Sequence, residues 1–259
     1  MRLRPLSLSG STPDKQLAPH CFSGHEGRSE ASRSGDVYQS LITSGVLSKT
    51  TPAVVAALSR RLQPLRFPRG RVVAAQSEFD DRIYVIISGK VKVSHRRPDG
   101  REIVLTILGP SEIFGAMRVF DPPLQEMSVT TLTEVVAVPI RRDQLLSWMA
   151  EHPEVSDQVL RLFARWAKRT AISLVDFASA DARSRIASQL LSLRHRFGQR
   201  EGDVVRIVHD LTLQDFSLLV GASPETIAAT LRDFGRRGWI RLENSSVVIV
   251  DGQALAGHV

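Results

Sequence analysis

A helix, a tight glycine turn and a second helix near the C-terminus constrain the fold of this 259-residue chain more than any other feature. The first helix is predicted over residues 212–220, with Thr212 as its N-cap, and the chain then turns at Gly221. The second helix opens with an N-cap, a proline in the first position and an acid in the first turn, which are Ser223, Pro224 and Glu225. Two short strands are predicted next, over residues 239–242 and 247–250. This order predicts a winged helix-turn-helix, a unit whose second helix enters the major groove of DNA.

The middle of the chain has the pattern of a small antiparallel β-structure. Runs rich in Val, Ile and Thr alternate with turn sequences such as Pro98-Asp99-Gly100, which is typical of short strands joined by tight turns. The predicted strand segments are residues 65–75, 82–87, 90–95, 102–107 and 128–140. A short helical pattern precedes them, with Thr51 as an N-cap and Pro52 in the first helical position. These segments favour a β-roll or barrel.

A long helical segment, residues 143–178, joins the two regions, and Pro153 is expected to interrupt it near its start. Beyond the proline, apolar residues recur every three or four positions: Val155, Val159, Leu162, Phe163, Trp166, Ile172, Leu174 and Phe177. Such a stripe is either a core-facing surface or, as we favour, the contact surface of a homodimer. Asp181 is a good N-cap for another helix over residues 182–197, so a hinge is expected near 178–181. Gly198 and Gly202 are expected to lie in the loop that follows.

The predicted fold class is α+β, with four parts. Residues 1–36 contain seven Ser, four Gly and three Pro without periodicity, which predicts a disordered extension. Residues 37–152 are expected to form the β-roll domain, residues 153–180 the dimerisation helix, and residues 181–259 the winged helix-turn-helix domain.

Composition excludes several classes of protein. No apolar stretch approaches 18 residues, so a membrane-spanning helix is not expected, and the N-terminus lacks the apolar core of a signal peptide. The single cysteine, Cys21, excludes an intramolecular disulfide. The sequence contains no HExxH, Gly-x-Ser-x-Gly or P-loop pattern, so no catalytic or metal-ligating residue is assigned and an enzyme is not expected. A net charge of +7 agrees with a polyanionic partner, and a cytoplasmic protein is expected.

Over residues 37–255 the sequence resembles the Crp/Fnr family of bacterial transcription regulators, in its cyclic-AMP-receptor-like branch. The motifs that carry the resemblance are residues 83–91, Ile113-Phe114-Gly115, residues 211–214, residues 220–227 and Arg237-Gly238-Trp239-Ile240. The resemblance implies a jelly-roll domain of the cyclic-nucleotide-binding type, a long dimer helix and a winged helix. It also implies a homodimer on two-fold symmetric double-stranded DNA, with RNA polymerase as a further candidate partner.

Carried onto this sequence, the resemblance assigns a set of DNA-binding residues. Thr212 and Gln214 match phosphate-contacting positions of the first helix. The remaining candidates are Ser223, Glu225, Thr226, Arg232 and Arg236, with Glu225 able to accept a hydrogen bond from a cytosine amino group and the arginines attracting the DNA backbone. Pro224 and Ala229 stand where relatives that read guanine place basic residues, so an altered, relaxed base preference is expected.

The implied nucleotide pocket departs further from the family pattern. Members that bind cyclic AMP have Gly-Glu and, about ten residues later, Arg-Ser or Arg-Thr; here these positions are Gly115-Ala116 and Gln125-Glu126. No Arg or Lys occurs from Val119 to Ile140, so the cyclic phosphate would lose a charge-assisted partner that contributes ~1.5–3 kcal/mol. Arg118 could replace it only by folding into the pocket. Thr170 matches a position that reaches the base across the dimer. Weak or absent cyclic AMP binding is therefore predicted, and no cofactor is assigned with certainty.

Three functions remain open at this point. The chain is a DNA-binding regulator modulated by cyclic AMP or another small ligand, or a ligand-independent DNA binder with relaxed preference that has lost nucleotide sensing. The third is a protein-interaction module that uses the roll and has a degraded winged helix.

Overall fold

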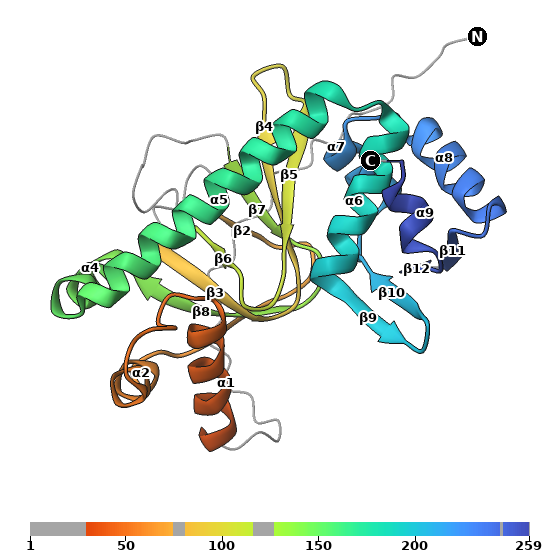
Figure 1. Ribbon diagram of the computed structural model, residues 1–259. Coiled ribbons are helices and arrows are strands. Elements are labelled where there is room, and N and C mark those ends of the chain that lie inside the picture. Colours follow the sequence, from red (N-terminus) through yellow and green to blue (C-terminus); the bar gives the residue numbers. More distant parts are fainter. Residues whose placement is uncertain (1–29, 75–80, 116–126, 244–245, 259) are drawn as a thin grey trace, which may run out of the picture.

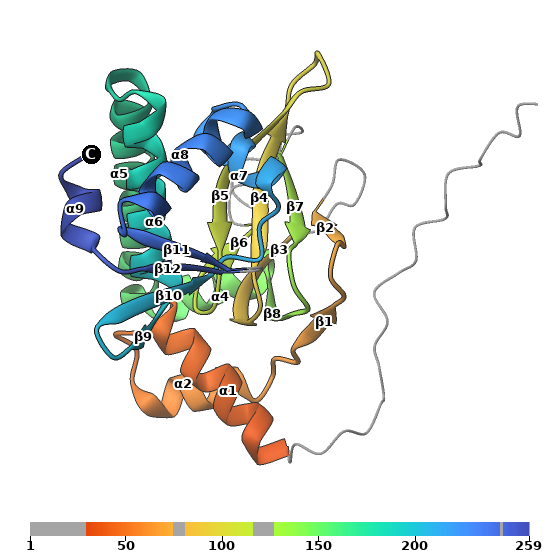
Figure 2. The same ribbon diagram turned by 90° about the vertical axis from the view of Figure 1, so that its right-hand side faces the viewer.

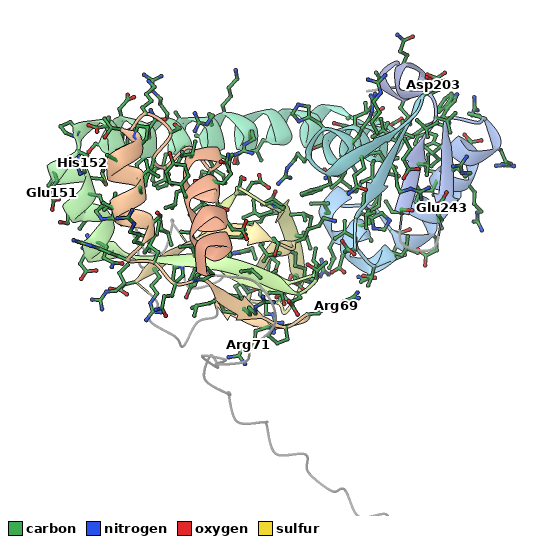
Figure 3. All side chains as sticks on the ribbon, turned by 90° about the horizontal axis from the view of Figure 1, so that it is seen from below. Arg69, Arg71, Glu151, His152, Asp203 and Glu243 are labelled. Carbon is green, nitrogen blue, oxygen red and sulfur yellow. The ribbon has the colours of Figure 1, made fainter. Side chains whose placement is uncertain are left out.

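The computed structural model describes residues 30–74, 81–115, 127–243 and 246–258. Its fold is α+β, with a central β-roll, a long helix running along it, and a second small domain at one end (Figures 1 and 2). Figure 3 shows the long dimension from below: Glu151 and His152 lie at one end, Asp203 and Glu243 at the other, and Arg69 and Arg71 on the roll between them. Within the described residues, no helix has the length and apolar character needed to cross a membrane.

Two four-stranded antiparallel sheets form the roll. One has the order β1-β8-β3-β6, with bounds Leu65–Phe67, Val135–Arg141, Arg82–Ser88 and Ile113–Phe114. The other has the order β2-β7-β4-β5, with bounds Val72–Ala74, Met127–Thr131, Val91–Arg96 and Glu102–Leu108. The core between them includes a T-shaped contact of Phe67 with Tyr84 and a stacked contact of Tyr84 with Phe114.

Two segments that were each predicted as one strand form two strands in the structure, so their predicted continuity is wrong. Residues 65–75 break into β1 and β2, and residues 128–140 break into β7 and β8, each pair contributing one strand to each sheet. The first break is the turn at Gly70, whose φ of +79° suits glycine. A roll needs such corners, because a strand that serves both sheets must bend from one to the other.

Three helices cover the outer face of the first sheet: α1 (Glu30–Thr43), α2 (Pro52–Ser59) and α4 (Arg142–Glu151). Helix α1 begins at Glu30, seven residues inside the segment predicted to be disordered, because Val37 and Leu41 anchor it in an apolar cluster with β3 and β8. The rest of that segment, including Cys21, lies outside the described residues. Thr51 has N-cap geometry before Pro52, as predicted, but its side chain makes no capping hydrogen bond.

Helix α5 (Pro153–Ser179) starts at the predicted proline and runs for 27 residues along the roll. One part of its predicted apolar stripe is buried and another part is exposed. Val155 and Val159 are buried, and Leu162 and Phe163 pack partly, against the same cluster as α1, so this part faces the protein's own core. Trp166 and Leu174 are exposed, with fractions of 39% and 65%, and so is Leu160, at 67%, which the predicted stripe did not include. The side chains of Ile172 and Phe177 lie outside the described part.

The C-terminal domain contains α6 (Ala182–Phe197), α7 (Leu213–Val220), α8 (Pro224–Arg236), α9 (Gly252–Ala256) and a sheet of order β11-β12-β10-β9. The strands are Ile240–Glu243, Ser246–Ile249, Val204–Val208 and Gly198–Glu201. The prediction of a loop at residues 198–202 is therefore wrong, because β9 begins at Gly198 and pairs with β10. Gly202, with a φ of +61°, supplies the tight turn between these strands. Asp181 caps α6 as predicted, its side chain accepting from the Ser184 amide at 2.7 Å.

Candidate nucleic-acid interface

The helix-turn-helix has a side-chain N-cap at each of its two helices, and the cap of α7 is reciprocal. Thr212 accepts from the Asp215 amide at 3.0 Å, and the Asp215 carboxylate accepts from the Thr212 amide at 3.2 Å. Gly221 ends α7 in the left-handed region, with a φ of 69°. Ser223 then caps α8 by accepting from the Thr226 amide at 3.2 Å. The sequence predicted each of these caps because each depends only on neighbouring residues.

Helix α8 has one buried and one exposed face. Ile227 and Phe234 are fully buried in the core of the domain. The seven residues expected to touch DNA are all exposed, and they lie at the start of α7 or along α8: Thr212, Gln214, Ser223, Glu225, Thr226, Arg232 and Arg236. The structure therefore brings this set together on one accessible unit.

Glu225 is prepared to act as a hydrogen-bond acceptor. Its own backbone N–H, followed by the Ser223 hydroxyl, holds the pKa of this carboxyl below its usual value. At neutral pH it is a carboxylate, which can accept from the amino group of cytosine but not from the carbonyl of guanine or thymine.

Asp233 of α8 pairs with three arginines, one of which, Arg236, is a DNA-contact candidate. Its carboxylate lies 2.5 Å from Arg183, 2.8 Å from Arg237 and 3.7 Å from Arg236. Hydrogen bonds from Arg183 and Arg237 lower the pKa of Asp233. The sequence analysis named Arg236 and Arg237 but neither Arg183 nor this acid, although the spacing of three and four residues between Asp233 and two of the arginines was a usable signal.

The C-terminal domain also packs against the roll through three ion pairs. Lys90, just before β4, lies 2.7 Å from Asp210, Lys92 of β4 lies 2.7 Å from Asp215, and Arg196 of α6 lies 2.6 Å from Glu112. Lys92 is also 3.6 Å from Glu102 of β5. Val104, Ile107 and Leu132 of the roll join the apolar core of the winged helix. Gly109 lies so close to the Phe197 ring that a methyl group in its place would overlap the ring.

These pairs shift the pKa values of their members. Burial alone would raise the pKa of Asp215, but hydrogen bonds from Lys92 and Thr212 outweigh it and lower the value. Burial alone would lower the pKa of Lys92, and the bonds to Asp215 and Glu102 raise it instead. His209 has a lowered pKa, first because of its burial and then because of the charge on Lys90. The sequence did not reveal these contacts, since the pairs are separated by more than 80 residues.

The candidate ligand pocket is described only at its edges. Gly115 follows β6 with a φ of +86°, and a Cβ there would lie 2.6 Å from the Arg82 carbonyl oxygen, so only glycine fits. Thr170 is exposed on α5, where its hydroxyl donates to the Trp166 carbonyl at 3.1 Å. Its neighbour Arg169 lies 3.5 Å from Glu112, which links this part of α5 to the approach to β6. The other four candidates lie outside the described residues: Ala116, Arg118, Gln125 and Glu126.

Comparison with known proteins agrees with this division of the chain. A cyclic nucleotide-binding domain model matches residues 64–152, and a Crp-like helix-turn-helix domain model matches residues 184–257. A "CRP-like cAMP-activated global transcriptional regulator" of Mycobacterium tuberculosis is 50% identical over 216 residues, which cover 83% of this chain and 96% of the relative. The chain belongs to the Crp/Fnr family of DNA-binding transcription regulators. Membership in this family of regulators agrees with the expectation of a non-enzyme.

More distant matches share the fold of this Crp/Fnr regulator. The cyclic AMP receptor protein of Thermus thermophilus is 26% identical, covering 82% of this chain and 93% of the relative. The solved structure of FixK2 from Bradyrhizobium japonicum matches with a TM-score of 0.68 at 15% identity, covering 76% of this chain and 96% of that one. No group of three or more potential metal ligands occurs among the residues that the structure describes.

Proposed function

We propose that this Crp/Fnr regulator binds two-fold symmetric DNA as a homodimer joined along α5, and that cyclic AMP is at most a weak effector. Two observations together carry the proposal. The candidate DNA-contact residues are exposed on α7 and α8, and a row of apolar side chains, here called the seam, is exposed on the long helix α5.

The seam follows a heptad pattern. Leu160, Ala164, Ala167, Ala171 and Leu174 are separated by four, three, four and three residues, and every one of them is exposed. This spacing is that of the a and d positions of a coiled coil, and small residues at its centre let two helices approach closely. Among the residues that the structure describes, none buries these side chains, so a second copy of α5 is the occupant that fits them.

A dimer through this seam would place two recognition helices on successive major grooves. Half-sites read by such dimers lie about 34 Å apart, one turn of the duplex. Base preference would come from Glu225 and its neighbours on α8, while Arg232 and Arg236 would contribute attraction to phosphates. A regulator of this type would work in the cytoplasm, where RNA polymerase is a candidate partner.

The seam is tested by Ala167→Glu, which places two like charges in the interface. Sedimentation at micromolar concentration should show a dimer for the wild type and a monomer for the variant. The monomer should bind a two-fold symmetric duplex far more weakly. Ala57→Glu, on the exposed side of α2, is the matched control and should stay dimeric. A monomeric wild type would refute the proposal.

A relative and this chain's own residues give opposite indications about a response to cyclic AMP. The M. tuberculosis relative is named as cAMP-activated, which supports a nucleotide response. Against it, Ala116 and Gln125 replace the family's glutamate and arginine, and no cation occurs between Val119 and Ile140. Two described arginines near β6, Arg169 and Arg196, already pair with Glu112. We therefore assign no mechanistic step to cyclic AMP in this protein.

Calorimetric titration with cyclic AMP, paired with a DNA mobility-shift assay, tests this assignment. The expected result is no heat at micromolar nucleotide and the same DNA affinity with and without it. Binding at micromolar affinity with a gain in DNA affinity would restore the cAMP-activated function named for the relative. If the protein fails to bind any duplex at low salt, the DNA-binding proposal itself fails.

A further inference from the structure

The tip of the β4–β5 hairpin, residues 96–101, concentrates positive charge. It contains Arg96, Arg97 and Arg101 but only one acid, Asp99. All three arginines are exposed, with 53% of the Arg97 side chain and 79% of the Arg101 side chain accessible. Asp99 approaches Arg97 at 4.0 Å and Arg101 at 3.7 Å, so it offsets one positive charge of the three.

The tip is also well ordered by its own hydrogen bonds. The Arg97 amide donates to the Arg101 carbonyl at 2.8 Å, and the Gly100 amide donates to the Arg97 carbonyl at 2.9 Å. Asp99 accepts from the Arg101 amide at 3.0 Å. Because the turn is already closed, the arginines are presented on a stiff support, and binding through them would cost little ordering of the backbone.

The base of the hairpin is fixed beside the helix-turn-helix. Lys92 of β4 pairs at 2.7 Å with Asp215, which belongs to the cap of α7, and Glu102 of β5 lies 3.6 Å from the same lysine. Strands rise about 3.3 Å per residue, so Arg96 lies roughly 13 Å beyond Lys92 along the strand. In both Figure 1 and Figure 2 the hairpin projects at the end of the roll where α7 and α8 lie, away from α1 and α2.

We propose that this hairpin tip binds backbone phosphates of duplex DNA outside the segment read by α8. The inference rests on the proposed DNA-binding function and extends the contact surface from the winged helix to the sensor roll. Duplex DNA carries one negative charge per about 1.7 Å of axis, so a rigid basic tip beside the recognition unit would meet phosphates of the flanking duplex. A dimer would present two such tips, one on each flank.

The test compares duplexes of two lengths that share one central site. The site is selected in vitro from a random pool with the wild-type protein, then embedded in duplexes of about 24 and about 50 base pairs, the shorter holding little beyond two half-sites. The variant Arg96→Gln/Arg97→Gln removes two tip charges. The control Arg60→Gln/Arg61→Gln removes two exposed charges at the end of α2, on the opposite end of the roll.

The wild type and the α2 control should bind the longer duplex about tenfold more tightly at low salt. The tip variant should lose that gain while keeping its affinity for the shorter duplex. Its plot of log affinity against log salt on the longer duplex should be shallower by roughly 2–4. A wild type without a length effect, a tip variant that keeps the effect, or an equal loss on both duplexes would each overturn the inference. Failure of the wild type to bind the shorter duplex would instead count against the proposed function.

Discussion

The roll is covered by helices at one end and by the DNA-binding domain at the other, and the two junctions differ in chemistry. At the first, α1, α2, α4 and the start of α5 bury a continuous apolar cluster against β3 and β8. At the second, three roll residues, Val104, Ile107 and Leu132, share an apolar core with the winged helix, and three ion pairs surround them. A contact rich in charged pairs loses little when water replaces it, whereas an apolar contact loses its full burial. Because fewer apolar side chains of the roll are buried at the second junction, its separation is expected to cost less free energy than separation of the first.

The largest effect is expected at the apolar junction. Leu41 is fully buried there, so Leu41→Ala should lower the free energy of unfolding by about 2–5 kcal/mol, through lost burial and the cavity that remains. Denaturant unfolding followed by tryptophan fluorescence measures this. A loss below about 1 kcal/mol would show that the cluster adapts easily and that the contrast between the junctions is smaller than inferred.

At the charged junction, Lys92→Met should cost less, about 1–3 kcal/mol, since it leaves the Asp215 carboxylate with a lost charge partner at a site only 12% exposed. The methionine keeps the aliphatic part of the side chain. A larger effect is expected on the mobility of the C-terminal domain. Proteolysis near Ala180 and Asp181, between α5 and α6, should be faster in the variant than in the wild type. Protection equal to that of the wild type would argue that the apolar contacts alone hold the domains together.

His209 should make the same junction sensitive to mild acid. Its pKa in the folded protein is lowered, chiefly by burial, so the unfolded chain binds more protons near its pKa of about 6.5. Stability from this group is complete above that pH and falls as the pH drops through it toward the folded-state value. His209→Asn keeps an acceptor for the Leu211 amide, 3.0 Å away, but does not titrate. The unfolding free energy should fall between pH 7.5 and 5.5 more in the wild type than in the variant; equal falls would contradict the assignment.

The smallest effect is expected for an exposed pair at the apolar junction. Lys49 and Asp157 are 3.5 Å apart, and about half of each side chain is accessible. Exposed pairs of this kind are screened by water, so Lys49→Gln should leave the melting temperature unchanged in a thermal scan. A clear drop would mean that charge matters at both ends of the roll.

The sequence predicted those features of the fold that local residues determine. Asp181, Thr212 and Ser223 cap their helices as expected, and Pro153 separates α4 from α5, because each signal acts within a few residues. The β9–β10 hairpin was missed because its glycines at 198 and 202 are equally typical of a loop. The alternative roles of the α5 stripe could not be separated either, since which face is buried depends on the roll beside it.

The site shows the same division. Seven candidate DNA-binding residues were named from the sequence, and all seven are exposed in the structure, at the start of α7 or along α8. The junction pairs at Lys90, Lys92 and Arg196 were not, because nothing local links a lysine of β4 to an acid more than a hundred positions later. Lys90 and Lys92 are two positions apart in the strand segment predicted over residues 90–95, a spacing that indicates a charged surface but not its partner.

Gly109 determines how closely the roll and the winged-helix domain approach each other. A single missing methyl group lets the Phe197 ring lie flush against the roll. Replacing it by Ala, then Ser, then Val would push the Phe197 ring and the roll apart by increasing amounts, while leaving the seven candidate DNA-binding residues unchanged. The smallest side chain at position 109 that changes DNA affinity would show how far the roll and the winged helix can separate before DNA binding is affected.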